Sequence, residues 1–432
     1  MRKILFIAVS LSLLIGCSKN EPVALKELQP NRAPQNFELI SPAIDAETDI
    51  IDITFEWEEA IDPDGDAVTY ELYIYTDGES PVRIAENLTT TSYVLESKSP
   101  FDTSYKWYVV ARDSGEESQI TVSVERDFTT RDIQTELVLD SGTPTSFPYR
   151  RAYTGLYFNN TFFITNGVWE SAMGDIWSSD NYGQSWSFER DLIDEGFSRY
   201  AHTSVIFDDR IYFMGGYQNA SPLQEIYTSS DGTNWDEVNM YGLFSPRYEH
   251  SSVVFNNKIW VIGGYNDTIL LDDVMSWTGT PEDRWELEAE SAQTPFNGIR
   301  GHSSVVFDNR IWVIGGTDQN GHSNAVWVSD DGVNWTSSQN LPIATTYHKS
   351  VVFDNKIWVI GGLTASGPST EIFYYDPETG LWDRYQAPDG VEITPSYNHA
   401  VVVVNDESPN DGIYIFGGFN GSEYFNNIWK LY

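Results

Sequence analysis

Arginine and tyrosine side chains gather at one recurring position in this sequence, just before a histidine that returns five times. The histidines are His202, His250, His302, His348 and His399, and Tyr153 takes their place in an earlier copy. The residues that precede them are Arg150, Arg151, Arg199, Tyr200, Arg247, Tyr248, Glu249, Arg300, Tyr347 and Tyr397. Arginine binds carboxylates through two parallel hydrogen bonds, and tyrosine faces stack on sugar rings. The cluster therefore predicts a pocket for an acidic or neutral glycan or for an acidic peptide.

The charge composition makes a cluster of arginines unusual in this chain. The chain carries 64 Asp and Glu against 25 Lys and Arg, a formal net charge of −39. Such a surface repels the phosphate backbone of nucleic acids, so no nucleic-acid partner is expected. Because basic residues are scarce, several arginines at one repeat position indicate a local positive pocket. The alternative is that these arginines pair with acids of their own sheets and hold loops together.

A paired glycine marks the elements that must position these residues. The pairs are Gly215-Gly216, Gly263-Gly264, Gly315-Gly316, Gly361-Gly362 and Gly417-Gly418, and a degenerate copy, Asn166-Gly167, precedes them. They recur with a period of roughly 50 residues, with four strand-like segments in each unit. This period is typical of the blades of a β-propeller. The sequence therefore predicts an all-β fold.

One copy of the repeat, residues 302–316, has the sequence HSSVVFDNRIWVIGG and resembles the kelch family. The resemblance implies a six-bladed kelch-type β-propeller over 132–432, in which the connections before each histidine lie at the mouth of the central channel. The sixth unit has no outermost strand of its own before Tyr432. An unpaired edge would then be exposed, so we expect the segment 135–140 to close the ring by pairing with 427–431.

The repeated histidines and two repeated turns have structural interpretations. Equivalent histidines around a ring could converge on a metal ion, but reuse at one place in each blade favours a histidine that bonds a neighbouring blade. No metal is predicted there. The segments 229–235 and 329–335 resemble the Asp boxes of sialidases, which are hairpin turns rather than catalytic groups.

Residues 34–131 are predicted to form a separate β-sandwich that resembles fibronectin type III domains. The alternating run 103–111 resembles a strand of that fold, and Trp57 is the expected core tryptophan. Within this domain, Asp62, Asp64 and Asp66 surround Pro63 and Gly65. These carboxylates could hold Ca²⁺, or they could simply form a turn; the turn is favoured because Ca²⁺ needs six to eight oxygens.

The N-terminus has the features of an export signal. Arg2 and Lys3 precede the short apolar run 4–15, and the sequence LIGC that ends at Cys17 resembles a bacterial lipobox. The resemblance implies a signal peptide over 1–17, a lipid on Cys17, and a location at the outer membrane or cell surface. The lipid would be the only contact with the membrane. Residues 18–33 are predicted to be a flexible tether.

Three classes of function are compatible with these features. The favoured class is an envelope-anchored binding module for a glycan or a protein. An enzyme is the first alternative: N-acetylneuraminate epimerase is kelch-type, and Glu249 could act as its base. Galactose oxidase is also kelch-type, but its cofactor needs a Tyr–Cys cross-link that Cys17 cannot supply. A structural envelope protein is the second alternative. No cofactor is predicted.

Overall fold

The computed structural model describes residues 30–432, except 51, 97–98, 116, 194–195, 240–241, 281, 291–293, 388–390, 392, 395 and 407. Every element assigned within these residues is a β-strand, so the predicted all-β fold is confirmed. No helix in this part of the chain is long and apolar enough to cross a membrane. The predicted signal peptide, Cys17 and most of the tether lie outside the described residues.

The chain divides into two compact units, which are described separately. One consists of Met1–Ala43 (described from residue 30), Phe55–Tyr93 and Lys106–Arg126, and the other of Ile44–Thr54, Val94–Tyr105 and Asp127–Tyr432.

Two sheets are formed by the first nine strands. The three-stranded sheet has the order β1 (Leu39–Ser41), β3 (Ile53–Trp57), β6 (Ser92–Leu95). The larger sheet has the order β2 (Ala46–Thr48), β9 (Arg126–Thr130), β7 (Ser104–Asp113), β4 (Val68–Thr76), β5 (Val82–Leu88), and β8 (Ile120–Val122) pairs with β7.

These sheets share a core that the alternation of β3 explains. Successive residues of β3 are buried and exposed in turn, which is the period of a strand with one covered face. Phe55 packs edge-on against Trp107 with ring centroids 5.0 Å apart, and Trp57 against Tyr70 at 5.5 Å. The position predicted for Trp57 in the core is confirmed, whereas the likeness to fibronectin type III domains stays a prediction.

The acidic turn of this region makes internal bonds. Asp62 Oδ1 accepts the backbone N–H groups of Asp64 at 2.8 Å and of Asp66 at 3.1 Å, and the Asp64 carboxylate pairs with Arg32 at 2.7 Å. Among the described residues, no group of three or more His, Cys, Asp or Glu is placed to hold a metal ion. The turn interpretation fits these bonds, and calcium at Asp62, Asp64 and Asp66 stays the alternative.

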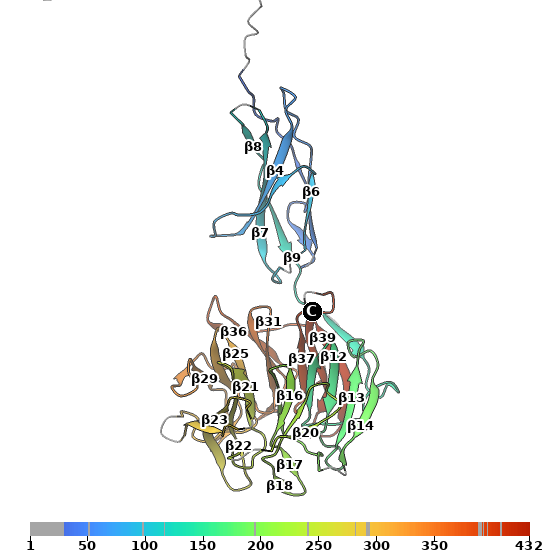
Figure 1. Cartoon of the computed structure of the whole chain (residues 1–432), viewed down its shortest axis with the longest axis vertical. Coiled ribbons are helices and arrows are strands. Elements are labelled where there is room, and N and C mark those ends of the chain that lie inside the picture. Colours follow the sequence, from blue (N-terminus) through green and yellow to red (C-terminus); the bar gives the residue numbers. More distant parts are fainter. Residues whose placement is uncertain are drawn as a thin grey trace, which may run out of the picture. The chain divides into compact units, whose positions relative to one another are not determined.

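Six four-stranded sheets make up the propeller (Figure 1). We number the blades 1 to 6 along the chain. From the inner to the outer strand, blade 1 consists of β11 (Thr154–Phe158), β12 (Thr161–Thr165), β13 (Asp175–Ser179) and β14 (Ser187–Asp191). Blade 2 consists of β15 (Thr203–Phe207), β16 (Arg210–Met214), β19 (Ile226–Ser229) and β20 (Asp236–Glu237). Blade 3 consists of β21 (Ser251–Phe255), β22 (Lys258–Tyr265), β23 (Leu270–Trp277) and β24 (Glu286–Ala289).

Blades 4 to 6 repeat this order. Blade 4 consists of β25 (Ser303–Phe307), β26 (Arg310–Ile314), β29 (Val326–Ser329) and β30 (Thr336–Ser337), and blade 5 of β31 (Lys349–Phe353), β32 (Lys356–Ile360), β35 (Ile372–Asp376) and β36 (Leu381–Arg384). Blade 6 consists of β37 (Ala400–Val404), β38 (Gly412–Phe419), β39 (Tyr424–Leu431) and β10 (Thr135–Leu139). Three short hairpins are β17 (Tyr217–Gln218) with β18 (Ser221–Pro222), β27 (Thr317–Asp318) with β28 (Gly321–His322), and β33 (Leu363–Thr364) with β34 (Gly367–Pro368).

The inner strands form a closed ring. Each of them lies beside the inner strands of the blades before and after it, and β37 of blade 6 lies beside β11 of blade 1. In blade 4, the turn between the two inner strands uses Asp308 and Asn309 with φ of 50° and 53°. Two residues with positive φ are what a tight hairpin turn requires, and Asp and Asn tolerate that conformation.

Blade 6 is completed by a strand from the other end of the repeat region. β10 pairs antiparallel with β39, with Thr135 opposite Leu431 and Leu137 opposite Trp429. This is the edge to which the sequence analysis assigns the segment 135–140. Because β10 covers the outer edge of β39, the last blade does not end in an open strand of eight residues.

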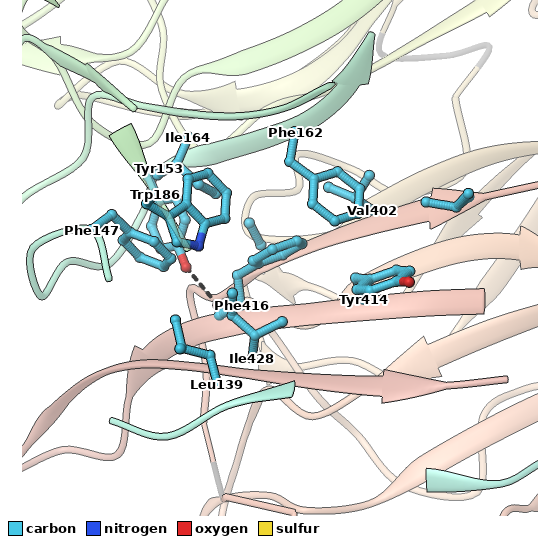
Figure 2. Close-up of a cluster of buried hydrophobic side chains, with 12 residues drawn as sticks. Leu139, Phe147, Tyr153, Phe162, Ile164, Trp186, Val402, Tyr414, Phe416 and Ile428 are labelled. Carbon is cyan, nitrogen blue, oxygen red and sulfur yellow. Dashed lines mark hydrogen bonds between the residues drawn. The ribbon is translucent and has the colours of Figure 1, made fainter. Parts of the chain in front are cut away.

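A buried cluster joins blades 1 and 6, as Figure 2 shows. Phe162 of β12 packs edge-on against Tyr414 of β38 at 4.9 Å, and the Tyr153 hydroxyl donates to the Phe416 carbonyl oxygen at 2.5 Å. The first repeat thus has a tyrosine at the histidine position, and this tyrosine bonds the blade that closes the ring.

The glycine pairs make room for the histidines. A Cβ on Gly315 would lie 2.7 Å from Cε1 of His348, the histidine of the next blade, and one on Gly316 would lie 2.7 Å from Cβ of His302 in the same blade. Both glycines have positive φ, 59° and 101°. Only glycine meets the steric and the backbone demands together.

Candidate functional site

The three residues before each histidine have different environments in the fold. The third residue before the histidine is buried between strands, the second pairs with the residue after the glycine pair, and the one directly before the histidine joins its counterparts in the other blades. The residues that the sequence predicts to form one cluster therefore fall into three groups in the structure.

Three of the predicted ligand-binding arginines, Arg150, Arg199 and Arg247, are buried. Arg150 forms two bonds to the Asp175 carboxylate, at 2.9 and 2.7 Å. Arg247 forms the same pair of bonds to Asp273, at 2.6 and 2.7 Å.

Each of these arginines also donates to the carbonyl oxygen at the first position of a glycine pair. The acceptors are Asn166 at 2.8 Å, Gly215 at 2.9 Å and Gly263 at 2.9 Å. The predicted role of Arg150, Arg199 and Arg247 in ligand binding is therefore corrected. These three side chains are buried, and they donate their hydrogen bonds to groups inside the blades. For these three residues, the alternative that the arginines hold the blades together fits the structure.

The residues directly before the histidines form a closed ring of backbone hydrogen bonds. In this ring Ala152, Ala201, Glu249, Gly301, Tyr347 and Asn398 each donate an N–H to the carbonyl oxygen of the preceding member, and Ala152 donates to Asn398. The donor–acceptor distances are 2.7 to 3.0 Å, and φ at all six residues is between 55° and 60°. Five members are not glycine, so the ring holds a backbone conformation that L-residues rarely adopt. Backbone strain of this kind is common at binding sites.

The residues two positions before each histidine all lie on the same side of this ring of backbone hydrogen bonds, the side away from the histidines. Each forms a β-bridge to the residue after the glycine pair, and the bridges are Arg151–Val168, Tyr200–Tyr217, Tyr248–Tyr265, Arg300–Thr317, Thr346–Leu363 and Tyr397–Phe419. Figure 1 shows hairpin β17–β18, which begins at Tyr217, at one end of the blades and the C-terminus at the other. The structure therefore brings Arg151, Tyr200, Tyr248, Arg300 and Tyr397 to one face of the propeller.

Aromatic rings cover much of this face. The rings are half-buried and contact one another in two series, which together we call the aromatic face. The first series consists of Tyr200, Tyr217, Tyr248 and Tyr265, and the second of Tyr347, Tyr397, Phe419 and Tyr424. Sequence reasoning missed Tyr217, Tyr265, Phe419 and Tyr424. An available signal was the aromatic residue directly after three of the glycine pairs.

Glu249 belongs to the ring of backbone hydrogen bonds, and its side chain contacts the aromatic face. Its Oε2 accepts the Tyr347 hydroxyl at 3.1 Å and lies 3.4 Å from an Arg300 nitrogen. Burial raises the pKa of Glu249, while the positive charges of Arg300 and Arg151 and the Tyr347 bond act in the opposite direction. The Arg300 guanidinium also lies over the Tyr265 ring, 4.9 Å from its centroid. The charge of Arg300 is thus engaged within the protein.

Arg151 differs from the other arginines in this region. Its guanidinium lies over the Phe419 ring at 5.1 Å, and no carboxylate of the described residues forms an ion pair with it. Its Nε is buried and has no hydrogen-bond partner in the part of the chain that the structure describes. A guanidinium has five N–H donors and stays charged. Arg151 therefore offers a positive group with free donors at the edge of the aromatic face.

The histidines lie on the inner side of the ring and bond the neighbouring blade. Nε2 of His202, His250, His302 and His348 lies 2.8 to 3.1 Å from a Thr or Ser hydroxyl of the preceding blade. The predicted role in joining blades is thus confirmed for these four. Burial lowers the pKa of His302 and of His348 to about 3, so both rings are neutral at physiological pH.

The comparison with protein families identifies the repeats. The family model described as the KLHDC2/KLHL20/DRC7 Kelch-repeats domain matches residues 201–340 and 282–432, which together make up more than half of the chain. A search of the curated proteins found no match.

Proposed function

We propose that the chain, which belongs to the kelch-repeat family, is a binding module whose ligand rests on the aromatic face. The β-propellers of this family serve in protein or ligand binding. The ligand carries a carboxylate, which Arg151 binds. The remaining contacts come from the tyrosine rings around Glu249. This proposal is narrower than the predicted glycan or protein ligand, and it rests on fewer of the predicted residues.

The observation that carries the proposal is the unpaired guanidinium of Arg151. The protein has a large excess of acids, yet none of those described pairs with this arginine. A carboxylate from another molecule can take both outer nitrogens in a bidentate geometry. Removal of water by neighbouring rings such as Phe419 would strengthen this bond.

A protein partner suits the face better than a glycan. Tyrosine and arginine are the residues enriched at the centres of protein interfaces, where rings exclude water from a few strong polar contacts. The ring of backbone hydrogen bonds holds the backbone beneath this face in place before a ligand binds, which lowers the entropy cost of binding. We therefore propose an acidic segment of a protein as the ligand, with a glycan as the competing class.

The N-terminal features complete the proposal. A lipid on Cys17 would hold the module at the outer membrane or cell surface, where the partner would be met. This part of the proposal rests on the sequence of residues 1–17 alone. Labelling of expressing cells with a radioactive fatty acid tests it: the wild type should carry label, and Cys17→Ser should not.

An array that combines acidic peptides and glycans tests the binding proposal. Wild-type protein should retain acidic peptides, and Arg151→Gln should lose about tenfold or more in signal, as expected for a charge-assisted bidentate bond. Arg310→Gln is the matched control, since Arg310 is half-buried, pairs with Asp308 and lies in the turn region of blade 4. Retention of glycans alone, or equal retention by Arg151→Gln, would reject the proposed ligand.

The enzyme alternative depends on Glu249 acting as a base. The neighbouring Arg247 is paired with Asp273, and His250 Nε2 is bonded to Thr203 at 2.9 Å. The contacts of Glu249 are with Tyr347 and Arg300. Proton NMR of sialic acid anomers incubated with the protein should show no rate above buffer; an acceleration lost in Glu249→Gln would restore the alternative.

A further inference from the structure

The propeller axis contains two adjoining cavities on the inner side of the ring of backbone hydrogen bonds. The smaller one, of about 50 Å³, is lined by the ring residues, the histidines and Lys349. The larger one, of about 180 Å³, is lined mainly by Ser and Thr residues of the inner strands and again by Lys349. Since water occupies about 30 Å³ in the liquid, the larger cavity has room for several small molecules or ions.

The hydroxyls follow a repeated pattern that Lys349 interrupts. The residue directly after each histidine position bonds Nε2 of the next histidine, and these residues are Thr154, Thr203, Ser251 and Ser303. In blade 5 this residue is Lys349, and Nε2 of the next histidine, His399, is buried with no partner among the residues described. An ammonium group thus stands where a repeated hydroxyl would complete the pattern.

The charge of Lys349 is not balanced inside the channel. No ion pair or hydrogen bond of its Nζ is made to the described residues. Burial lowers the pKa of Lys349, and no carboxylate opposes that effect. Burial also lowers the pKa of His202 in blade 2, and the charges of Arg199, His250 and Lys349 add to this effect.

A second free donor lines the same cavity. Ser252 Oγ is buried, and no described residue forms a hydrogen bond with it. Other hydroxyls are already paired, since Ser303 Oγ lies 2.6 Å from Ser350 Oγ and Ser251 is bonded to Ser304. The ammonium group of the half-buried Lys349 and the buried Ser252 hydroxyl both have no partner among the described residues, and an anion in the cavity would satisfy both groups.

We propose that the axial channel holds a small inorganic anion, bound by the Lys349 ammonium and the Ser252 hydroxyl. A chloride or a phosphate ion would neutralise the lysine and accept hydrogen bonds from both groups. The site is separate from the aromatic face, because the ring of backbone hydrogen bonds lies between them. A bound ion would stabilise the protein, because an ion that binds only the folded state raises the free energy of unfolding.

Bromide, which replaces chloride and scatters anomalously, tests the site in crystals of the whole protein. An anomalous peak in the channel within hydrogen-bond reach of Lys349 Nζ supports the proposal, and its absence from crystals of Lys349→Ser ties it to the lysine. A channel without a peak in bromide and without tetrahedral density in phosphate overturns the proposal. A peak that persists in Lys349→Ser overturns the role of the lysine.

Thermal unfolding provides a second readout at constant ionic strength. The melting temperature of the wild type should rise by about 2–4 °C for each tenfold increase in bromide or phosphate above the dissociation constant. Lys349→Ser restores the hydroxyl found in blades 3 and 4, so it should fold at least as stably without anion and lose the response. Ser252→Ala should weaken it. Equal responses of the wild type and Lys349→Ser would contradict the proposal.

Discussion

Arg150 and Arg151 are neighbours in the chain, and their surroundings are opposite. Arg150 is buried and held by Asp175, while Arg151 lies at the aromatic face without an acid partner among the described residues. Alternation along an extended chain sends adjacent side chains to opposite sides, so one faces the blade and the other faces the aromatic face. The same residue type therefore contributes to stability at one position and is available for binding at the next.

This comparison extends to the whole repeat. The interior positions, which include the buried arginines, the histidines and the glycine pairs, hold the blades together. The aromatic face makes few of those contacts. Changes to the interior should therefore reduce stability in proportion to what they unpair, whereas changes to the face should alter binding with little effect on unfolding.

The largest interior effect is expected from removal of the closing strand. Deletion of residues 132–141 exposes the edge of β39 and removes Leu139 from the cluster of blades 1 and 6. We expect aggregation, or a loss of about 5 kcal/mol or more, a large share of the stability of a typical protein. Differential scanning calorimetry measures this, and an unchanged transition would rule out closure by this strand.

Point variants on β10 give the control. Leu139 is buried and Leu137 is 44% exposed. Leu139→Ala should cost about 2–5 kcal/mol and Leu137→Ala much less.

Loss of a buried arginine should have the next largest effect. Arg150→Ala leaves the Asp175 carboxylate without its partner in a buried setting, and about 3–5 kcal/mol of unfolding free energy should be lost. Arg151→Ala should change it by only about 0.5 kcal/mol. Urea titration compares the two. Similar losses for both variants would break the distinction between interior and face.

The glycine pair should show a smaller steric effect. Gly315→Ala places a Cβ 2.7 Å from His348 Cε1 and 2.8 Å from the Thr345 carbonyl oxygen, whereas Gly196→Ala at φ 74° meets no atom within 4 Å. Both substitutions have the backbone penalty, so the collision should make Gly315→Ala worse by about 1–3 kcal/mol. Melting curves test this. Should His348→Ala fail to relieve the extra loss, the histidine would not be its cause.

Acid should reveal a still smaller interior contribution from the Asp-box turn. Burial acts to raise the pKa of Asp331, but hydrogen bonds from Asn334, Val333 and Ser329 outweigh it and lower the pKa to about 2. A lowered pKa stabilises the fold above the ordinary value near 4, and this stability is lost as the pH falls toward 2. Because Asp331 is exposed, solvent screening limits the effect to about 1 kcal/mol. Asp331→Ala should lessen the difference between the melting temperatures at pH 5 and pH 2.5; an unaltered difference would exclude this carboxylate.

Much of the propeller could be predicted from the repeat. The spacing of Gly315-Gly316 and its equivalents and the missing outer strand of the last unit indicated six sheets and the closing segment. The buried role of Arg150, Arg199 and Arg247 was not separated from the role of Arg151 because both positions fall in short connections, where strand alternation is hard to place from sequence. The ring through Ala152 and Ala201 is made by backbone atoms, so side-chain types gave little sign of it.

The central claim is that Arg151 binds an acidic ligand and does not support the fold. Isothermal titration of the best acidic peptide from the array, with wild type and Arg151→Gln of equal melting temperature, tests it most directly. We predict that the substitution weakens binding by about tenfold or more. Equal dissociation constants would contradict the account.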